Sequence, residues 1–270
     1  MLSVVSQASS PRPDYRHPPV TEVALAVQFA EPLPIGAGEV EHMSEVWEDM
    51  VPVSSIREPL PSLNPYVGSE EDAVASPPTQ RLWLTDDTGN RVVQFQSDRL
   101  TVNWQKSDER DEYPRFEAIR EFFVTAWQRL TDRLEADGLE APEPNVCDVL
   151  YMNQLGEAQG WSGSSDTAAL LAPWNGSHSD EFLPEPEMTG IYLHYHLPTL
   201  GWLNVEAWEA TDDDENGLLA LYLQSRGHLP IEDCNLDGAL AFMDEAREWI
   251  VRGFTSVTTE HGHRIWGRFQ

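Results

Sequence analysis

The order of hydrophobic patterns along this chain occurs twice, and this repetition limits most strongly what the chain can fold into. Each half starts with a strand pattern, continues through an irregular stretch and three further strand patterns, and ends with a long amphipathic helix pattern. The first strands, at Val23 and Cys147, are 124 residues apart, and the same interval separates the helices at Phe116 and Leu240. We interpret the repeat as a duplication, although the same order also arises by chance in an α+β protein.

The repeat predicts the α+β class, with two similar halves that are each a mainly antiparallel four-stranded sheet with a long helix packed on one face. At 270 residues the chain is near the upper limit of one domain, so the halves are expected to pack tightly on each other. The predicted organisation is a flexible N-terminal arm that carries several prolines over residues 1–19, a first α+β half over residues 20–138 and a second α+β half over residues 139–270.

The strands are predicted from the alternation of apolar and polar residues. In the first half they are expected at residues 20–29, 81–85, 91–96 and 99–104, and in the second half at 145–155, 190–197, 202–210 and 218–226.

Helices are predicted where apolar residues recur at helical spacing. Long helices are expected over residues 114–136 and 236–260, with a helix of about 14 residues after the first strand and a helical turn at residues 167–171. Residues 51–79 are rich in proline and are predicted to form a long surface loop.

The charge composition limits the partners of the chain. Its 46 Asp and Glu residues against 17 Lys and Arg residues give a net charge of -29, and Lys106 is its only lysine. Such a charge repels phosphate backbones, so direct binding of nucleic acid is not expected. The acidic side chains either only keep the surface solvated or form a face for a basic protein partner, such as the product of a neighbouring gene.

Cysteine usage and hydropathy predict a cytoplasmic protein. Cys147 and Cys234 are too few for a disulfide framework and lack the spacing of metal ligands, so we expect both to be reduced and buried. Residues 1–10 contain no basic and apolar leader pattern, and no apolar run is long enough to span a membrane. No nucleotide-binding motif occurs, and neither a cofactor nor a metal ion is expected.

Two stretches of the sequence resemble a known family. Residues 18–29 fit a PPxxEVxLxVxF start, and residues 98–104 fit a DRLxxNW strand that precedes a helix opening at Tyr113-Pro-Arg-Phe116. Together they resemble a sporadically distributed, uncharacterised bacterial protein family of about this length. The resemblance implies a bacterial cytoplasmic protein and supplies no catalytic residues. A patchy distribution is typical of antitoxin, immunity and phage-defence genes.

Amide side chains are predicted to share one face of the sheets. If the alternating apolar residues face the helices, the opposite face carries the polar residues Gln28, Gln94, Gln96, Thr101, Asn103, Gln105 and Asn153. Amides are costly to bury without hydrogen-bond partners, so this face is either wetted or binds something polar. We treat these amides, together with His194 and His196, as the candidate residues for binding a partner or ligand.

The two histidines also suggest chemistry. His194 and His196 are two residues apart on a predicted strand, so both project from one face. This spacing suits a metal site with Cys147 as a third ligand, but packing among aromatic residues is the simpler interpretation. An enzyme that uses dispersed residues, such as these histidines with Glu206 and Glu209, is a further hypothesis. No catalytic or metal-binding residue is therefore assigned.

Four consecutive acidic residues, Asp212, Asp213, Asp214 and Glu215, are predicted to form the tip of a hairpin. Solvent screens adjacent charges at such a tip. The pattern of a calcium loop fails, because Leu223 stands where a distal Glu is required. We interpret these residues as part of the acidic surface.

These patterns favour a non-enzymatic binding or regulatory protein, of the antitoxin, immunity or phage-defence kind, that engages a protein partner through its acidic surface. The alternative is a small-molecule sensor with a ligand cleft between the two halves, closed by a lid that contains Trp161, Trp174 and Phe182.

Overall fold

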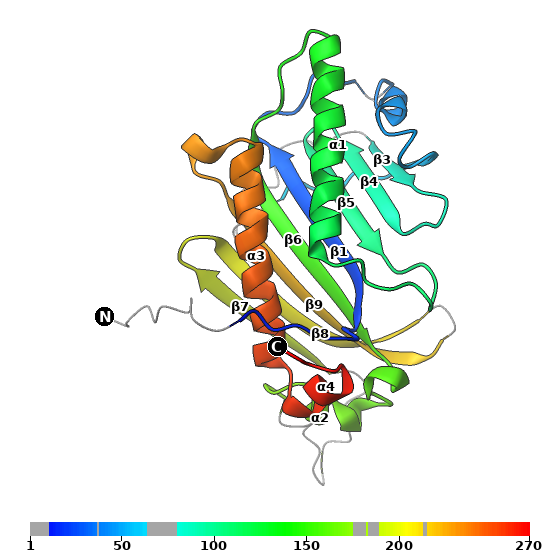
Figure 1. Cartoon of the computed structure of the whole chain (residues 1–270), viewed down its shortest axis with the longest axis vertical. Helices are drawn as coiled ribbons and strands as arrows, with labels where there is room; N and C mark the ends of the chain where they lie inside the picture. The colour runs from blue at the N-terminus through cyan, green and yellow to red at the C-terminus, as the bar shows by residue number, and fades with distance from the viewer. Residues whose placement is uncertain (1–10, 37, 64–79, 175–181, 183–188, 213–214) are drawn as a thin grey trace.

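The fold is built on one nine-stranded antiparallel sheet (Figure 1). The computed structural model describes residues 11–36, 38–63, 80–174, 182, 189–212 and 215–270. The strands lie in the order β2, β3, β4, β5, β1, β6, β9, β8, β7, and each neighbouring pair is antiparallel. Their bounds are β1 Val20–Phe29, β2 Val53–Arg57, β3 Arg81–Thr85, β4 Arg91–Gln96, β5 Arg99–Gln105, β6 Pro144–Leu155, β7 Gly190–Leu197, β8 Gly201–Thr211 and β9 Gly217–His228.

The α+β class is confirmed, but the two separate sheets of the prediction are one sheet. Strand β1 pairs with β5 through Leu25 and Val102 on one side and with β6 through Leu25 and Val149 on the other. A sheet of four strands ends in an exposed hydrogen-bonding edge, and pairing β1 with β6 removes two such edges at once. Strand β2 is a ninth strand in a stretch that was predicted to be a loop.

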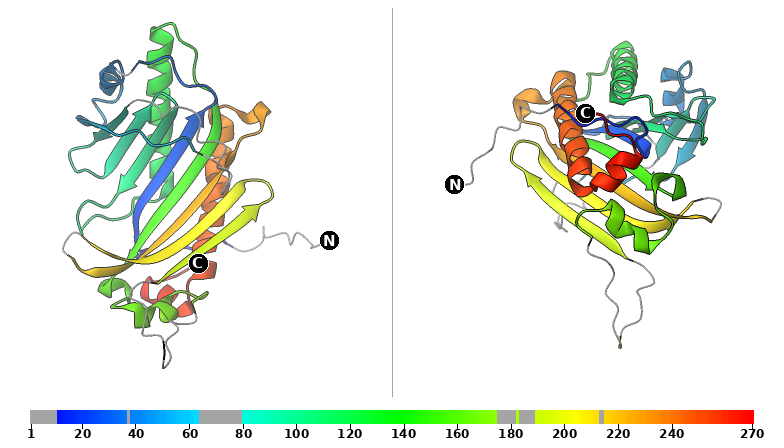
Figure 2. Two further views of the ribbon diagram at one scale, coloured as in Figure 1. Left: turned by 180° about the vertical axis from the view of Figure 1, so that it is seen from behind. Right: turned by 60° about the horizontal axis from the view of Figure 1, so that its bottom comes forward.

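Two long helices cover the same face of the sheet (Figure 1). Helix α1 (Phe116–Ala136) packs on β1 and β5, and helix α3 (Leu236–Val257) packs on β6 and β9. Both helices bury an apolar side at helical spacing, for example Phe123 and Met243, which are fully buried. Among the described residues, the opposite face of the sheet carries no long helix, and it is called the helix-free face below (Figure 2, left). None of the helices among the described residues is long and apolar enough to cross a membrane.

The shorter elements surround this frame. They are η1 (Glu41–Val46), η3 (Glu157–Gln159), η4 (Ser164–Asp166), α2 (Thr167–Leu170), η5 (Ile231–Asp233) and α4 (Glu260–Ile265). The helix predicted after β1 is instead the short 3-10 helix η1, followed by turns, and the indole of Trp47 donates a hydrogen bond to the carbonyl oxygen of Ala126 at 2.9 Å. The predicted C-terminal helix ends at Val257, because Thr258 is extended before α4 begins.

The N-terminal segment follows the C-terminal one across the helix-covered face. The backbone N–H of His17 donates to the carbonyl oxygen of Trp266 at 3.1 Å, and that of Phe269 donates to the carbonyl oxygen of Asp14 at 3.1 Å. The side chain of Tyr15 is buried against Phe254 and Trp266. Residues 1–10 of the predicted flexible arm lie outside the described residues, whereas residues 12–18, called the N-terminal strap below, are instead packed into the fold.

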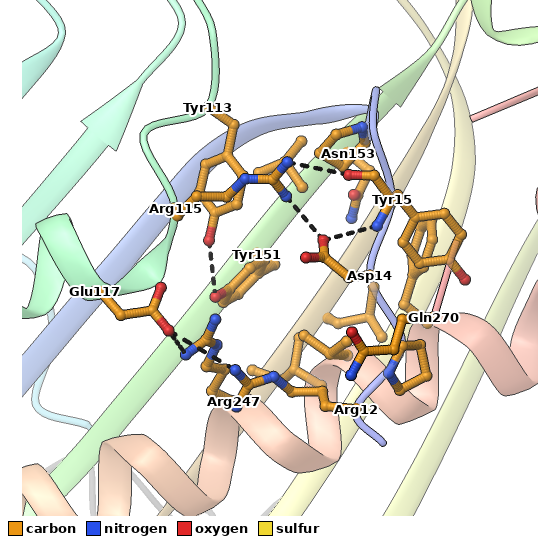
Figure 3. Close-up of a pocket in the computed structure, with 17 residues that line it drawn as sticks. Arg12, Asp14, Tyr15, Tyr113, Arg115, Glu117, Tyr151, Asn153, Arg247 and Gln270 are labelled. Atoms are coloured by element: carbon orange, nitrogen blue, oxygen red, sulfur yellow. Dashed lines mark hydrogen bonds and ion pairs between the residues drawn. The ribbon is translucent and has the colours of Figure 1, made fainter. Parts of the chain in front are cut away.

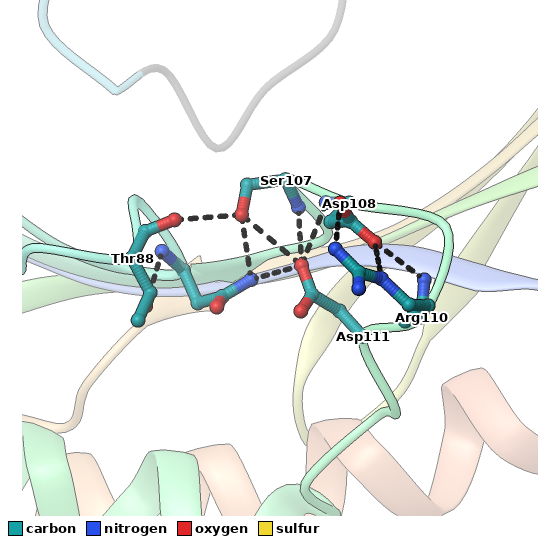
Figure 4. Close-up of polar contacts among 6 residues, drawn as sticks. Thr88, Ser107, Asp108, Arg110 and Asp111 are labelled. Carbon is teal, nitrogen blue, oxygen red and sulfur yellow. Dashed lines mark hydrogen bonds and ion pairs between the residues drawn. The ribbon is translucent and has the colours of Figure 1, made fainter.

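A hydrogen-bonded turn cluster holds the chain just before α1 (Figure 4). One carboxylate oxygen of Asp111 accepts hydrogen bonds from the side chain of Asn90 at 2.7 Å and from the backbone N–H groups of Ser107 at 3.0 Å and Asp108 at 2.7 Å. These bonds, that from Asn90 first, lower the pKa of Asp111 to about 2. The cluster joins the β3–β4 turn to the loop after β5, and so fixes the start of the segment that leads to the cavity.

Candidate functional site: a cavity beneath the N-terminal strap

A cavity of about 250 Å³ lies under the N-terminal strap, between the start of α1, the middle of α3 and strands β6 and β9 (Figure 3). Residues from the strap, from both long helices and from the sheet therefore line the same space. Its lining consists of Arg12, Pro13, Asp14, Tyr15, Pro18, Val20, Tyr113, Arg115, Glu117, Tyr151, Asn153, Leu223, Arg247, Ile250, Val251, Phe254 and Gln270.

Arg115 connects the start of α1 with the strap. One guanidinium nitrogen donates to the carboxylate of Asp14 at 2.9 Å, and another donates to the carbonyl oxygen of Tyr15 at 3.1 Å. The same Asp14 oxygen accepts the backbone N–H of Tyr15 at 2.7 Å. A guanidinium has five N–H donors, so Arg115 keeps donors for a further acceptor.

The backbone of Arg115 is strained. Its φ of 74° and ψ of 156° lie in a region that is almost confined to glycine, yet Arg115 stands there as the residue that precedes helix α1. Strain of this kind costs about 1–3 kcal/mol and is characteristic of binding and catalytic sites. The strained backbone places the guanidinium against the strap and the cavity (Figure 3).

Two further arginines surround Glu117 in the first turn of α1. Arg247 of α3 donates to the Glu117 carboxylate at 2.5 Å and stacks over the ring of Phe116 at 4.6 Å. Arg12 of the strap lies 3.7 Å from the same carboxylate. Burial raises the pKa of Glu117, but the hydrogen bond from Arg247 and the charges of Arg247 and Arg12 outweigh this effect. The pKa is lowered overall, so the carboxylate is ionised.

Two phenols form a wall of the cavity. The hydroxyl oxygens of Tyr113 and Tyr151 are 3.2 Å apart, and the Tyr113 ring packs on Trp104 with ring centres 5.5 Å apart. Burial raises the pKa of Tyr151 to about 12, and it raises the pKa of Tyr113 well above its ordinary value. Both hydroxyls are therefore neutral near pH 7, and they serve as hydrogen-bond donors or acceptors.

The rest of the lining is mostly apolar. Leu223 of β9 and the α3 side chains Ile250 and Phe254 contribute an apolar surface, and all three are buried. Asn153 of β6 lines the same space and is tied down, because its amide donates to the carbonyl oxygen of Leu221 at 3.0 Å. The cavity thus combines cationic and hydroxyl groups with an apolar surface, an arrangement that suits a small anion with an apolar body.

The cavity concentrates positive charge in an acidic chain. Three of the 17 Lys and Arg residues line it, against two acidic side chains, Asp14 and Glu117. The chain as a whole has a net charge of -29, so the excess of cationic over acidic side chains in the cavity is opposite in sign to the net charge of the chain. The three arginines come from the strap, the segment before α1 and the middle of α3, and no local motif links them. The signal available in the sequence was the scarcity of cationic residues together with Arg115 in the Tyr113-Pro-Arg-Phe116 stretch.

The structure separates Asn153 from the other candidate amides. Asn153 belongs to the helix-covered face, because it alternates in phase with Val149 and Tyr151, and its expected place among the other amides is corrected. The others lie on the helix-free face. There Arg81 donates to Gln94 at 2.8 Å, and Gln94 donates to Asn103 at 2.8 Å.

Most of the remaining amides hold this chain's own backbone. Gln96 accepts the N–H of Leu60 at 2.6 Å, and Gln28 accepts the N–H of Leu63 at 2.5 Å. Gln105 donates to the carbonyl oxygen of Gly89 at 3.0 Å. These three amides therefore form hydrogen bonds with backbone groups of the protein itself.

The histidines of β7 pack with aromatic and amide groups. The His194 ring stacks on Trp202 with centres 4.2 Å apart and its Nδ1 contacts Asn204, while His196 contacts the edge of the same indole at 4.7 Å. Cys147 lies on β6, separated from β7 by two strands, and does not meet them. Within the described residues, no group of three or more His, Cys, Asp or Glu side chains is placed to hold a metal ion.

The dispersed catalytic set is not brought together. Glu206 pairs across the sheet with Tyr192 and Tyr222, whereas Glu209 projects from the other side of β8 and accepts a hydrogen bond from Thr189 at 2.9 Å. His194 and His196 therefore do not converge with both carboxylates.

The predicted lid and acidic tip also take other places. Trp161 is buried and donates to Thr167 at 3.0 Å, Trp174 packs against the core, and Phe182 is 89% exposed, so none of the three lines the cavity. At the tip, the carboxylate of Asp212 accepts hydrogen bonds from the backbone and side chain of Asn216 at 2.8 and 3.0 Å, and Glu215 is exposed. Asp213 and Asp214 lie outside the described residues.

Comparisons with known proteins add little. Neither the protein-family models nor the curated proteins include a match to this chain. Among solved structures, the crystal structure of the di-domain ARO/CYC StfQ from the steffimycin biosynthetic pathway is similar at 12% identity and a TM-score of 0.21, covering 91% of this chain and 97% of that chain. A likeness at this level carries no argument about function.

Proposed function

We propose that this chain is a binding protein that takes a small organic anion, a carboxylate or a phosphate with an apolar body, into the cavity beneath the N-terminal strap. The observation that carries the proposal is that Arg12, Arg115 and Arg247 line one cavity in a chain with a net charge of -29. A guanidinium binds planar oxyanions through two parallel N–H donors, and such charge-assisted bonds are stronger than neutral ones.

The lining supports a ligand that is more than an inorganic ion. The neutral hydroxyls of Tyr113 and Tyr151 offer hydrogen bonds without charge, and Ile250 and Phe254 offer apolar contact. Small-molecule sites typically combine an apolar lining with a few fixed polar groups. The strain at Arg115 further supports a functional role for this position.

This proposal develops the small-molecule sensor that the sequence left as an alternative. The lining comes from residues on both sides of the predicted boundary, such as Tyr113 and Arg115 before it and Tyr151 and Arg247 after it. The function predicted first, binding a protein partner through an acidic surface, stays a prediction. Its test is co-purification from the native host, in which salt should weaken the association steeply.

We also infer that the two halves arose by duplication. In support, β1 is followed along the sheet by β5, β4 and β3 on one side, and β6 is followed by β9, β8 and β7 on the other, so corresponding strands occupy corresponding places. Helices α1 and α3 end the two sets and lie on the same face. The arrangement supports a ligand cavity between the related units.

Calorimetry with four matched probes tests the proposed function. Benzoate and phenyl phosphate carry an anionic group on the same ring, benzyl alcohol carries a neutral group, and benzylamine carries a cationic one. We expect saturable binding of at least one anion and none of the neutral or cationic probes. Arg115→Gly should weaken that binding at least about tenfold, because it removes a charged donor and glycine tolerates the local φ.

Arg264→Gln is the matched control, since Arg264 is exposed on α4 and does not line the cavity. It changes the net charge equally and should leave the affinity unchanged. Binding of benzyl alcohol as tightly as benzoate, or unchanged affinity in Arg115→Gly, would contradict the proposal.

A further inference from the structure

A second group of arginines lies on the helix-free face, away from the cavity. Arg57 on β2 is the cross-strand partner of Arg81 on β3, and Gln96 on β4 is the partner of Arg99 on β5. The pairing of Leu82 with Phe95 places Arg81 beside Gln96. Three arginines from three different strands therefore lie in one row across the sheet.

Trp83 orients the outer two arginines. The Arg57 guanidinium carbon lies 3.8 Å from the centre of the indole, and that of Arg81 lies 5.5 Å from it. Stacking on an aromatic ring holds a guanidinium in a defined plane and leaves its edge donors free for an acceptor. Arg81 also donates to Gln94 at 2.8 Å, which fixes it further.

The two outer arginines, Arg57 and Arg81, bring two positive charges together, and two N–H donors of the row are unsatisfied. Burial lowers the pKa of Arg81, and the nearby charge of Arg57 lowers it as well. Neither Arg57 nor Arg81 forms an ion pair with a carboxylate of the described part of the chain. In the part of the chain that the structure describes, the Nε groups of Arg81 and Arg99 are buried and have no hydrogen-bond partner, and a buried donor left unpaired is destabilising.

Arg99 marks the inner end of the site. Its side chain is only 5% exposed, and it donates to the carbonyl oxygen of Pro61 at 2.5 Å. The segment that contains Pro61 thus closes the row on this side, while Arg57 at the other end is exposed. A ligand is expected to approach from the edge formed by β2 and β3.

We propose that Arg57 and Arg81, beside Trp83, bind a phosphate group at this edge of the helix-free face. Two guanidiniums present more donors than the two oxygens of a carboxylate accept, whereas a phosphate offers three or four oxygens and a second negative charge. The site is independent of the cavity, since it uses other residues on the opposite face of the sheet.

Titration calorimetry at low ionic strength tests the site with inorganic phosphate and with phenyl phosphate. We expect saturable millimolar binding that Arg57→Gln and Arg81→Gln each weaken at least about tenfold, as expected for loss of a charge-assisted hydrogen bond. Equal affinity for the two probes would assign the site to the phosphate group alone. Tighter binding of phenyl phosphate that persists in the Arg115→Gly background, where the cavity lacks its arginine, would assign the site to a phosphate monoester.

Two controls separate this proposal from the cavity. Arg264→Gln makes the same change in net charge on α4 and should leave the binding of inorganic phosphate unchanged. Repeating the titrations in the Arg115→Gly background removes the cavity arginine, and Arg57→Gln should weaken phosphate binding by the same factor there. Arg57 is exposed, so Arg57→Gln remains informative even if Arg81→Gln is poorly folded. Binding that is absent, or that stays unchanged in Arg57→Gln, overturns the proposal.

Discussion

At the scale of single residues, the most informative position is Arg115. It is a long cationic side chain on a backbone conformation that suits glycine, and it is one of two residues other than glycine with a positive φ in the described chain. The other, Glu215, is in an exposed turn where strain is easily tolerated. Arg115 keeps its place because Asp14 and the backbone of Tyr15 hold its guanidinium.

The lowered pKa of Asp111 makes the stability of the fold depend on pH. Its folded pKa of about 2 is lower than the value of about 3.9 for an unfolded Asp. A lowered folded pKa stabilises the fold above the unfolded pKa, and this stabilisation is lost as the pH falls from about 4 towards about 2. We therefore expect Asp111→Asn to be less stable than the wild type near neutral pH, with a difference that shrinks on acidification.

Urea unfolding followed by circular dichroism at a series of pH values measures this difference. Asp87→Asn, in the exposed turn that precedes β4, removes a neighbouring charge without touching the cluster and serves as the control. A difference between Asp111→Asn and the wild type that stays constant down to about pH 2 would contradict the interpretation.

At the scale of elements, local alternation predicts the strands well. The predicted strands at residues 91–96 and 190–197 coincide with β4 and β7, because each alternation depends only on which side chains face the helices. Strand β2 could not be predicted in this way, since all its side chains are exposed and its sequence has no period of two. Apolar residues spaced like a helix in fact form the tighter η1.

Gly227 shows how closely these elements approach one another. A Cβ at this position would overlap the carbonyl oxygen of Leu200 and lie 3.1 Å from the ring of Phe242. We expect Gly227→Ala to lower the free energy of unfolding by about 1–3 kcal/mol, because the backbone at Leu200 and the ring of Phe242 must shift. Gly163→Ala is the matched control, since its Cβ would meet no atom within 4 Å. Equal midpoints of urea unfolding for the two variants would refute this prediction.

At the scale of the whole molecule, the cavity could not be predicted from the sequence. Its lining comes from the strap, the segment before α1, the first turn of α1, three strands, α3 and Gln270, and only the fold brings these parts together. The strap itself carries Pro13 and Pro18, a composition that predicts a flexible arm. Its order depends on hydrogen bonds to residues near the other end of the chain, such as Trp266 and Phe269.

Asp14 of the strap is expected to compete with an anionic ligand for the guanidinium of Arg115. In the structure the carboxylate of Asp14 occupies one nitrogen of that guanidinium at 2.9 Å, so an anionic ligand must share or displace it. Both side chains of this ion pair are about two fifths exposed, and such pairs are worth about 0–1 kcal/mol. Asp14→Asn should therefore tighten the binding of benzoate by up to about fivefold.

Glu121→Gln, an equal change of charge on the exposed side of α1, is the control, and titration calorimetry measures both variants. Long-range repulsion alone would tighten binding equally in the two variants and would fall away in salt within a Debye length of about 10 Å at 0.1 M. Tighter binding confined to Asp14→Asn would show that the strap supplies a built-in competitor for the ligand, and weaker binding would show that Asp14 instead positions Arg115 to receive it.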